Sequence, residues 1–257
     1  MAHAHDAARM GATPHWEPED IIGKMTLKTL LFSNDYRHIA IKGVLTSVVM
    51  LGLGGLMAML FRTELAVPDI QFFGARPYMQ LMTLHGMLMV FGFVIPFVIA
   101  LNYYMIPKVL GTGQLLWASV AQWSYWLLII AAVFLVIARP DFTWTFYPPM
   151  SLRVGGDLVW LGYIAVLLVA ISEFLAGAVL MRNGWEAARR IGWSKLPLMG
   201  WGAISEGILL MGSTPMLGLV GIYMLTDWLQ ITATFDPARG GDVMTFMFMF
   251  WFYGHPA

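Results

Sequence analysis

Residues 156–181 read GDLVWLGYIAVLLVAISEFLAGAVLM, an apolar stretch whose only charged side chains are Asp157 and Glu173. At a rise of ~1.5 Å per residue, a helix of this length exceeds the ~30 Å hydrocarbon core of a bilayer. Further apolar segments lie on both sides, at 39–61, 78–106, 115–138, 197–225 and 243–257. The sequence therefore predicts an all-α membrane protein, a bundle of five complete spans and most of a sixth.

The composition supports this class. Hydrophobic residues make up 59% of the chain, charged residues 12%, and the mean hydropathy is +0.70. In soluble domains the corresponding shares are nearer ~47% and ~25%. The chain has no cysteine, which excludes disulfides, thiolate metal sites and iron–sulfur clusters within it. A net charge of zero gives no indication of a nucleic-acid partner.

The basic residues predict the orientation. If the N-terminus lies inside, ten Lys and Arg residues fall on the inner side of the membrane and five on the outer side. Cytoplasmic loops carry the excess of positive charge, so we expect the N-terminus in the cytoplasm. Residues 1–38 form a polar N-terminal tail in this interpretation, and 39–257 form the membrane part.

The last apolar stretch, 243–257 (VMTFMFMFWFYGHPA), has 15 residues and would rise only ~22 Å as a helix. That is too short to cross the bilayer, and we expect the chain to be the front portion of a longer protein.

Two histidines fall inside predicted spans, each beside a glycine: His85 before Gly86, and His255 after Gly254. A histidine in lipid is costly unless it is paired or bound to a metal. A glycine next to it would let a bulky planar group approach the helix backbone. A hydrogen-bonded core histidine remains the alternative for either one alone, so these residues by themselves indicate only a membrane protein with buried metal or haem sites.

Six motifs follow one another in a fixed order, each on a predicted span or loop. They are 34–39 (NDYRHI), 60–65 (LFRTEL), 83–91 (TLHGMLMVF), 144–149 (WTFYPP), the loop with 225–227 (LTD), 235–237 (FDP) and 240–242 (GGD), and 250–256 (FWFYGHP). In this order they resemble the catalytic subunit I of haem–copper terminal oxidases over nearly all of the chain after residue 34.

The resemblance implies roles at the first haem. His85 would be an axial ligand of a low-spin haem, with its partner ligand on a later span. Arg62 would lie against a polar edge of that haem, although an arginine that extends from a helix end towards water is the alternative. Trp144 would lie near the haem propionates, and Tyr147 in the same loop is assigned to haem binding with it.

The resemblance also implies a copper site. His255 would be the first of three histidine ligands to copper, which would leave an open position for oxygen. Trp251 would pack near that copper and take part in the catalytic site. Pro256 would free the carbonyl of Phe252 and kink the helix beside the metal. Trp144 and Trp251 have an equally good alternative as ordinary interface or core tryptophans.

The chain departs from the family pattern at acidic positions. Gln114 and Ala257 stand where the best-known oxidases carry an Asp and a Glu that conduct protons, which puts the usual proton route in doubt. Glu173 and Glu206 lie inside apolar runs and are the remaining candidates for proton-active acids. A neutral carboxylic acid that is hydrogen-bonded to a neighbouring helix is the alternative for each.

The resemblance implies a respiratory enzyme that reduces dioxygen to water with a low-spin haem, a high-spin haem and copper. Electrons would come from cytochrome c, a small copper protein or a quinol, and the partners would be subunits similar to oxidase subunits II and III. The location would be the cytoplasmic (inner) membrane of a bacterium or archaeon. A nitric oxide reductase with haem and iron is one alternative, and a transporter or a structural membrane subunit is another.

Overall fold

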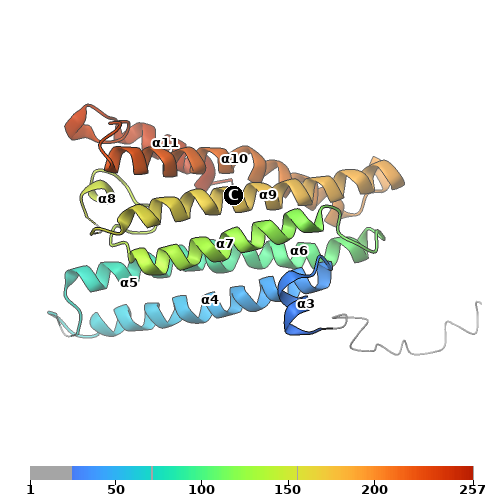
Figure 1. Cartoon of the computed structure of the whole chain (residues 1–257), viewed down its shortest axis with the longest axis horizontal. Coiled ribbons are helices and arrows are strands. Elements are labelled where there is room, and N and C mark those ends of the chain that lie inside the picture. Colours follow the sequence, from blue (N-terminus) through green and yellow to red (C-terminus); the bar gives the residue numbers. More distant parts are fainter. Residues whose placement is uncertain (1–24, 71, 155, 257) are drawn as a thin grey trace, which may run out of the picture.

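The computed structural model describes residues 25–70, 72–154 and 156–256; most of the polar tail, and Ala257, lie outside the described residues. Figure 1 shows long helices side by side that alternate in direction. Five are long and apolar enough to cross a membrane. They are α4 (Tyr36–Glu64), the continuous α5–η1–α6 segment (Ala75–Val109), α7 (Ala118–Ala138), α9 (Val159–Ile191) and α10 (Leu198–Trp228). The shorter apolar α11 (Val243–Gly254) follows, which confirms the predicted bundle.

Short elements complete the described part. α3 (Leu27–Phe32) precedes the first span and is capped by Thr26, whose side chain accepts a hydrogen bond from the backbone of Thr29. α8 (Met150–Arg153) and the 3₁₀ turns η2 (Trp193–Lys195) and η3 (Pro237–Arg239) lie in the connections. Among the described residues there is no strand.

The closest packing in the bundle is between α9 and α10, and it depends on glycine. A Cβ atom on Gly207 of α10 would lie 2.6 Å from the carbonyl oxygen of Gly177 and 2.8 Å from the backbone nitrogen of Met181, both on α9. Small residues that let backbones approach are the usual means of helix association in membranes, where hydrophobic burial gives no driving force between helices.

The second span is not a uniform α-helix. Its middle section η1 (Leu88–Val94) is a π-helix, between α5 (Ala75–Met87) and α6 (Ile95–Val109). Pro96 comes two residues after the end of η1 and has no backbone N–H, so the carbonyl group one turn earlier cannot be paired in the α pattern. Wide turns of this kind often accompany functional sites. Here the widened section begins three residues after His85.

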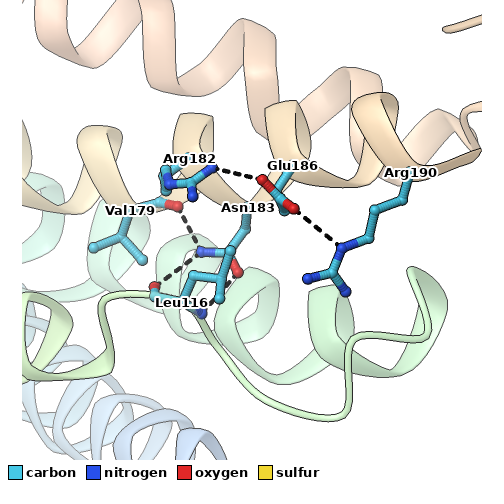
Figure 2. A network of polar contacts seen from close by, with 6 residues as sticks. All are labelled: Leu116, Val179, Arg182, Asn183, Glu186 and Arg190. Atoms are coloured by element: carbon cyan, nitrogen blue, oxygen red, sulfur yellow. Dashed lines mark hydrogen bonds and ion pairs between the residues drawn. The ribbon is translucent and has the colours of Figure 1, made fainter. Parts of the chain in front are cut away.

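α9 continues to Ile191, ten residues beyond the predicted end of the span at 181. Ion pairs four residues apart support this polar extension: Glu186 pairs with Arg182 at 2.9 Å and with Arg190 at 3.1 Å. Next to Arg182 in the sequence, the buried Asn183 accepts from the backbone N–H of Leu116 at 2.9 Å and donates to its carbonyl at 3.1 Å (Figure 2). Asn183 thus joins α9 to the residues just before α7.

The connections alternate between the two ends of the bundle (Figure 1). The described Lys and Arg residues therefore divide as the sequence predicted. One end has Lys28, Arg37, Lys42, Lys108, Arg182, Arg189, Arg190 and Lys195, and the other end has Arg62, Arg76, Arg139, Arg153 and Arg239. Which end faces the cytoplasm stays a prediction.

Candidate functional site

His85 is partly buried on α5, and its ring is held by a neighbouring helix. Its Nδ1 atom lies 2.9 Å from the carbonyl oxygen of Gly54 on α4, and the ring of Phe61 packs edge-on at 5.5 Å. A carbonyl can only accept a hydrogen bond, so Nδ1 carries the proton and the lone pair is left on Nε2. This is the tautomer and orientation in which a histidine can bind a metal. His85 thus fits the donor chemistry of a haem iron ligand.

A tryptophan side chain of this chain packs closely on the glycine beside His85. A Cβ atom on Gly86 would lie 2.7 Å from the Cβ of Trp144, and the indole lies directly beyond it. Gly254 plays the same part on α11, where a Cβ would lie 2.9 Å from the ring of Trp251. In both places the planar group is a tryptophan of this chain.

The loop between α7 and α8 lies over both histidine-bearing helices. The backbone N–H of Thr143 donates to the Thr83 hydroxyl on α5 at 2.8 Å. Thr143 and Phe146 have positive φ angles of 70° and 37°, which is costly for side chains of this kind. The fully buried Phe146 ring is held against Phe246 and Phe250 of α11, with ring centroids 5.6 and 5.4 Å apart.

Tryptophan and tyrosine connect this loop to α11. The indole N–H of Trp251 donates to the hydroxyl of Tyr147, and the rings of Trp144 and Trp251 meet at right angles, 6.1 Å apart. Trp144 also contacts Phe250, at 5.8 Å. Three residues that the sequence assigned to the site, Trp144, Tyr147 and Trp251, therefore form one aromatic cluster.

His255 follows α11 as its C-cap, and its backbone N–H donates to the carbonyl of Trp251 at 3.2 Å. Its side chain is exposed. Pro256 comes two residues after Gly254, the last residue of α11, and the kink expected of it stays a prediction. Among the described residues, no three histidine or acidic side chains come together as a complete metal site. His85 and His255 would each supply one ligand of a larger set.

Arg62 is exposed near the end of α4, one residue after the Phe61 that packs on His85. This position fits an arginine near a haem edge and equally fits an arginine that extends towards water.

Acidic residues of the motifs organise loops. The buried Glu64 accepts from the backbone N–H groups of Phe72 and Phe73, and the buried Asp227 accepts from those of Thr234 and Phe235. Anionic acceptors of several N–H bonds hold loop backbone strongly, which explains these motif positions by local structure.

Asp242 caps α11. Hydrogen bonds from the Thr245 hydroxyl and from the backbone of Met244 and Thr245 lower the pKa of its carboxyl below the usual range. At the other end of the molecule, hydrogen bonds from Arg37 lower the pKa of Asp35, which caps α4.

The two candidate acids lie in different surroundings. Glu173 of α9 is 2% exposed, and one of its oxygens accepts from the Tyr253 hydroxyl of α11 at 2.8 Å. Glu206 of α10 is partly buried and accepts from the amide of Asn102 on α6 at 2.6 Å. Glu206 also lines a groove with Pro256. Both acids thus have contacts or shared surfaces with the end of α11.

Some features of the site were missed by the sequence. The Glu173–Tyr253 and Glu206–Asn102 pairs join residues 80 and 104 positions apart, and no local pattern indicates such pairs. Away from the site, in the first turn of α4, His38 is buried and neither ring nitrogen has a partner among the described residues. The π-helical section had a signal, since Pro96 stands in the middle of an apolar run.

Comparisons with known proteins agree with this arrangement. The family model described as "Cytochrome C and Quinol oxidase polypeptide I" matches residues 38–257. Cytochrome c oxidase subunit 1 of Synechocystis sp. is 33% identical over 235 residues, covering 88% of this chain and 42% of that relative. The protein of that name from Thermostichus vulcanus is 30% identical, with the same coverage. Heme-copper oxidase subunit I+III of Aeropyrum pernix is 30% identical, covering 87% of the chain and 28% of the relative.

The chain therefore belongs to the family of haem–copper oxidase subunit I, as a divergent member, and is an integral membrane protein. It spans less than half of the length of these curated relatives.

Proposed function

We propose that this chain is the N-terminal part of the catalytic subunit of a respiratory haem–copper oxidase that reduces dioxygen to water. In this proposal residues 39–257 supply the first spans of the catalytic domain, after a tail at 1–38. The observation that carries the proposal is the ring of His85, whose Nδ1–H is fixed by the Gly54 carbonyl so that Nε2 is free for iron. Family membership supports the same conclusion.

The cofactors, two haems and copper, would supply electron transfer and oxygen binding. His85 would hold the low-spin haem by Nε2, and Arg62 would offer a fixed cation near its edge. Trp144 and Tyr147 would form the wall of that site through the aromatic cluster described above. A fixed cation near a haem favours the reduced state, and a low-dielectric aromatic wall strengthens that effect.

At the second site, His255 would supply one neutral imidazole to copper, with the other ligands outside this chain. Trp251 would pack beside it, and its hydrogen bond to Tyr147 would fix the indole. Among the described residues no three His, Asp or Glu side chains come together, so His255 would be one member of a larger ligand set and Trp251 would position it.

The donor would be cytochrome c, a small copper protein or a quinol. Partner subunits would resemble subunits II and III, and the name of the Aeropyrum pernix relative, subunit I+III, supports the second of these. The place of action would be the cytoplasmic membrane of a bacterium or archaeon, with the N-terminus inside.

The test separates the two histidines in the complete protein. His85→Ala should abolish the low-spin haem bands in the reduced-minus-oxidised spectrum, because iron loses an axial ligand. His255→Ala should keep those bands, while copper content and oxygen consumption collapse. His38→Ala is the control, and it should keep haem, copper and turnover.

Two outcomes would contradict the proposal. If the purified wild-type protein shows no haem bands, the chain serves a transporter or a structural subunit instead. Full copper occupancy with normal turnover in His255→Ala would show that the assignment of α11 is wrong.

A further inference from the structure

We infer that Glu173 is the internal proton-holding group of this protein, fed by water in a cavity between α4, α6, α7 and α9. The inference deepens the proposed function, because reduction of dioxygen to water consumes protons that must cross an apolar bundle. Charged or hydrogen-bonding groups have to provide that passage, since lipid and apolar side chains do not.

Only one of the two carboxyl oxygens of Glu173 has a hydrogen-bond partner among the described residues. One oxygen accepts from the Tyr253 hydroxyl of α11, which fixes the direction of the side chain. The other, Oε1, is fully buried and has no hydrogen-bond partner among the described residues. A buried carboxyl oxygen without a partner is costly unless water or a proton satisfies it.

A cavity of about 40 Å³ adjoins this carboxyl. It is lined by Glu173 and Ser172 of α9, Tyr103 of α6, and Ser124 and Tyr125 of α7, together with apolar side chains. One water needs roughly 10–15 Å³ of such space, so about three can fit.

The polar groups of the cavity can hold water. The Tyr103 hydroxyl is buried and has no hydrogen-bond partner among the described residues, like Glu173 Oε1. Ser124 and Ser172 each donate to the other's carbonyl, at 2.9 and 2.7 Å, which leaves their oxygens free to accept. A buried water with two to four polar partners is stable, whereas purely apolar cavities stay dry.

The cavity leads towards the basic end of the bundle. Tyr125, on its wall, is hydrogen-bonded to Thr46 at 2.9 Å, and the ammonium of Lys42 lies 4.4 Å from the centre of the Tyr125 ring. Lys42 donates to Gln122 and to the carbonyl of Leu31 in α3, at the end predicted to face the cytoplasm. Polar groups thus continue from that end to Glu173 and on to Tyr253.

The step is a simple proton transfer. A proton that arrives from the basic end forms a hydronium ion in the cavity water, and the Glu173 carboxylate takes that proton, which leaves neutral water and a neutral acid. The acid then gives the proton to a hydroxide or water oxygen on the α11 side, where reduction of dioxygen consumes protons, and the carboxylate is restored. Tyr253 acts here as a hydrogen-bond partner that keeps the carboxyl between the two sides. Glu206 lacks this setting, because it is partly exposed, accepts from Asn102, and lines a separate groove between the second span and α10.

The experiment uses the complete oxidase complex with Glu173→Gln, and Glu206→Gln as the matched control. Glu173→Gln keeps size and hydrogen bonding but cannot ionise. Positioned acid–base groups contribute on the order of 10²-fold or more, so turnover should fall at least about tenfold. Haem and copper content should stay unchanged. Glu206→Gln should keep more than about half of the wild-type turnover, because a group outside the acid–base step contributes little.

Infrared spectroscopy provides a reading that does not depend on turnover. The wild type should show a protonated-carboxyl band that shifts in heavy water, and Glu173→Gln should lose it while Glu206→Gln keeps it. Glu173→Asp should retain a shifted band and recover part of the turnover. If the Glu173→Gln protein does not accumulate, Tyr103→Phe tests the inference instead. It should shift the protonated-carboxyl band of Glu173 and lower turnover.

Turnover of Glu173→Gln within about twofold of wild type, or loss of the exchangeable band in Glu206→Gln instead, would overturn the inference. If the wild type contains no haem, the proposed function is refuted. The exchangeable carboxyl band of Glu173 can still be measured on that preparation, so this result leaves the test of Glu173 separate.

Discussion

His85 shows how much of a site one residue can reveal. Its residue type and its place in an apolar span indicated a ligand, but its hydrogen-bond partner, Gly54, lies 31 positions earlier on another helix. No sequence pattern specifies that contact, because it depends on how α4 and α5 pack. Glycine is needed at both Gly54 and Gly86, because neighbouring side chains pack closely against these two positions. A Cβ on Gly54 would meet the sulfur of Met89 at 2.9 Å, and one on Gly86 would meet Trp144.

Gly86→Ala should therefore destabilise the complete protein and displace Trp144 from the histidine-bearing helix. The added methyl would lie 2.7 Å from the Trp144 Cβ, which belongs to a loop already held at positive φ angles and cannot move freely. Overpacking of this kind costs about 1–3 kcal/mol, and it should lower the midpoint of thermal unfolding in detergent.

Gly52→Ala on the adjacent helix is the matched control. A Cβ there meets nothing within 4 Å, so its unfolding midpoint should stay at or above that of the wild type. Equal midpoints for the two variants would mean that Trp144 does not pack on Gly86 in the folded protein.

Helices were predictable where burial in lipid determines them. Apolar runs predicted the five spans, because a bilayer requires long apolar helices with all backbone groups paired. The polar continuation of α9 to Ile191 was missed, since ion pairs and the Asn183 contacts support it and hydropathy does not register them (Figure 2). The π-helical section was missed because its cause, Pro96, changes pairing without changing polarity.

The α9–α10 pair gives the prediction at this scale. Gly207→Ala should separate the two helices and lower the unfolding midpoint by an amount equivalent to about 1–3 kcal/mol. The new methyl would lie 2.6 Å from the Gly177 carbonyl and 2.8 Å from the Met181 nitrogen, and backbone atoms cannot rotate away.

The same helix supplies two controls, Gly202→Ala and Gly212→Ala, where a Cβ meets nothing within 4 Å. Both should unfold like the wild type. A loss of stability shared by all three variants would point to glycine itself, and not to the contact with α9.

The packing of the whole bundle brings the site residues of different helices together. α5 and α11, which carry the two histidines, are joined through the loop at 139–149, with Thr143 bonded to α5 and Phe146 packed on α11. The sequence placed Trp144 and Tyr147 near the site by their motif, but the cluster they form with Trp251 required the packed bundle. The alternation of connections between two ends was predictable, because each span reverses the chain direction (Figure 1).

Orientation is the prediction of the whole molecule. The basic end, with Lys108, Arg182 and Arg190 among its residues, should face the cytoplasm, because positive loops are retained there. The chain has no cysteine, so a single introduced cysteine can report on which side of the membrane its loop lies.

In intact cells, a membrane-impermeant maleimide should label Val67→Cys, whose native residue is 52% exposed in the connection after α4. Gln114→Cys, exposed in the connection before α7, should react only after the membrane is opened, and the parent protein sets the background. The reverse pattern would invert the whole bundle and place the cavity beside Glu173 at the wrong end to receive cytoplasmic protons.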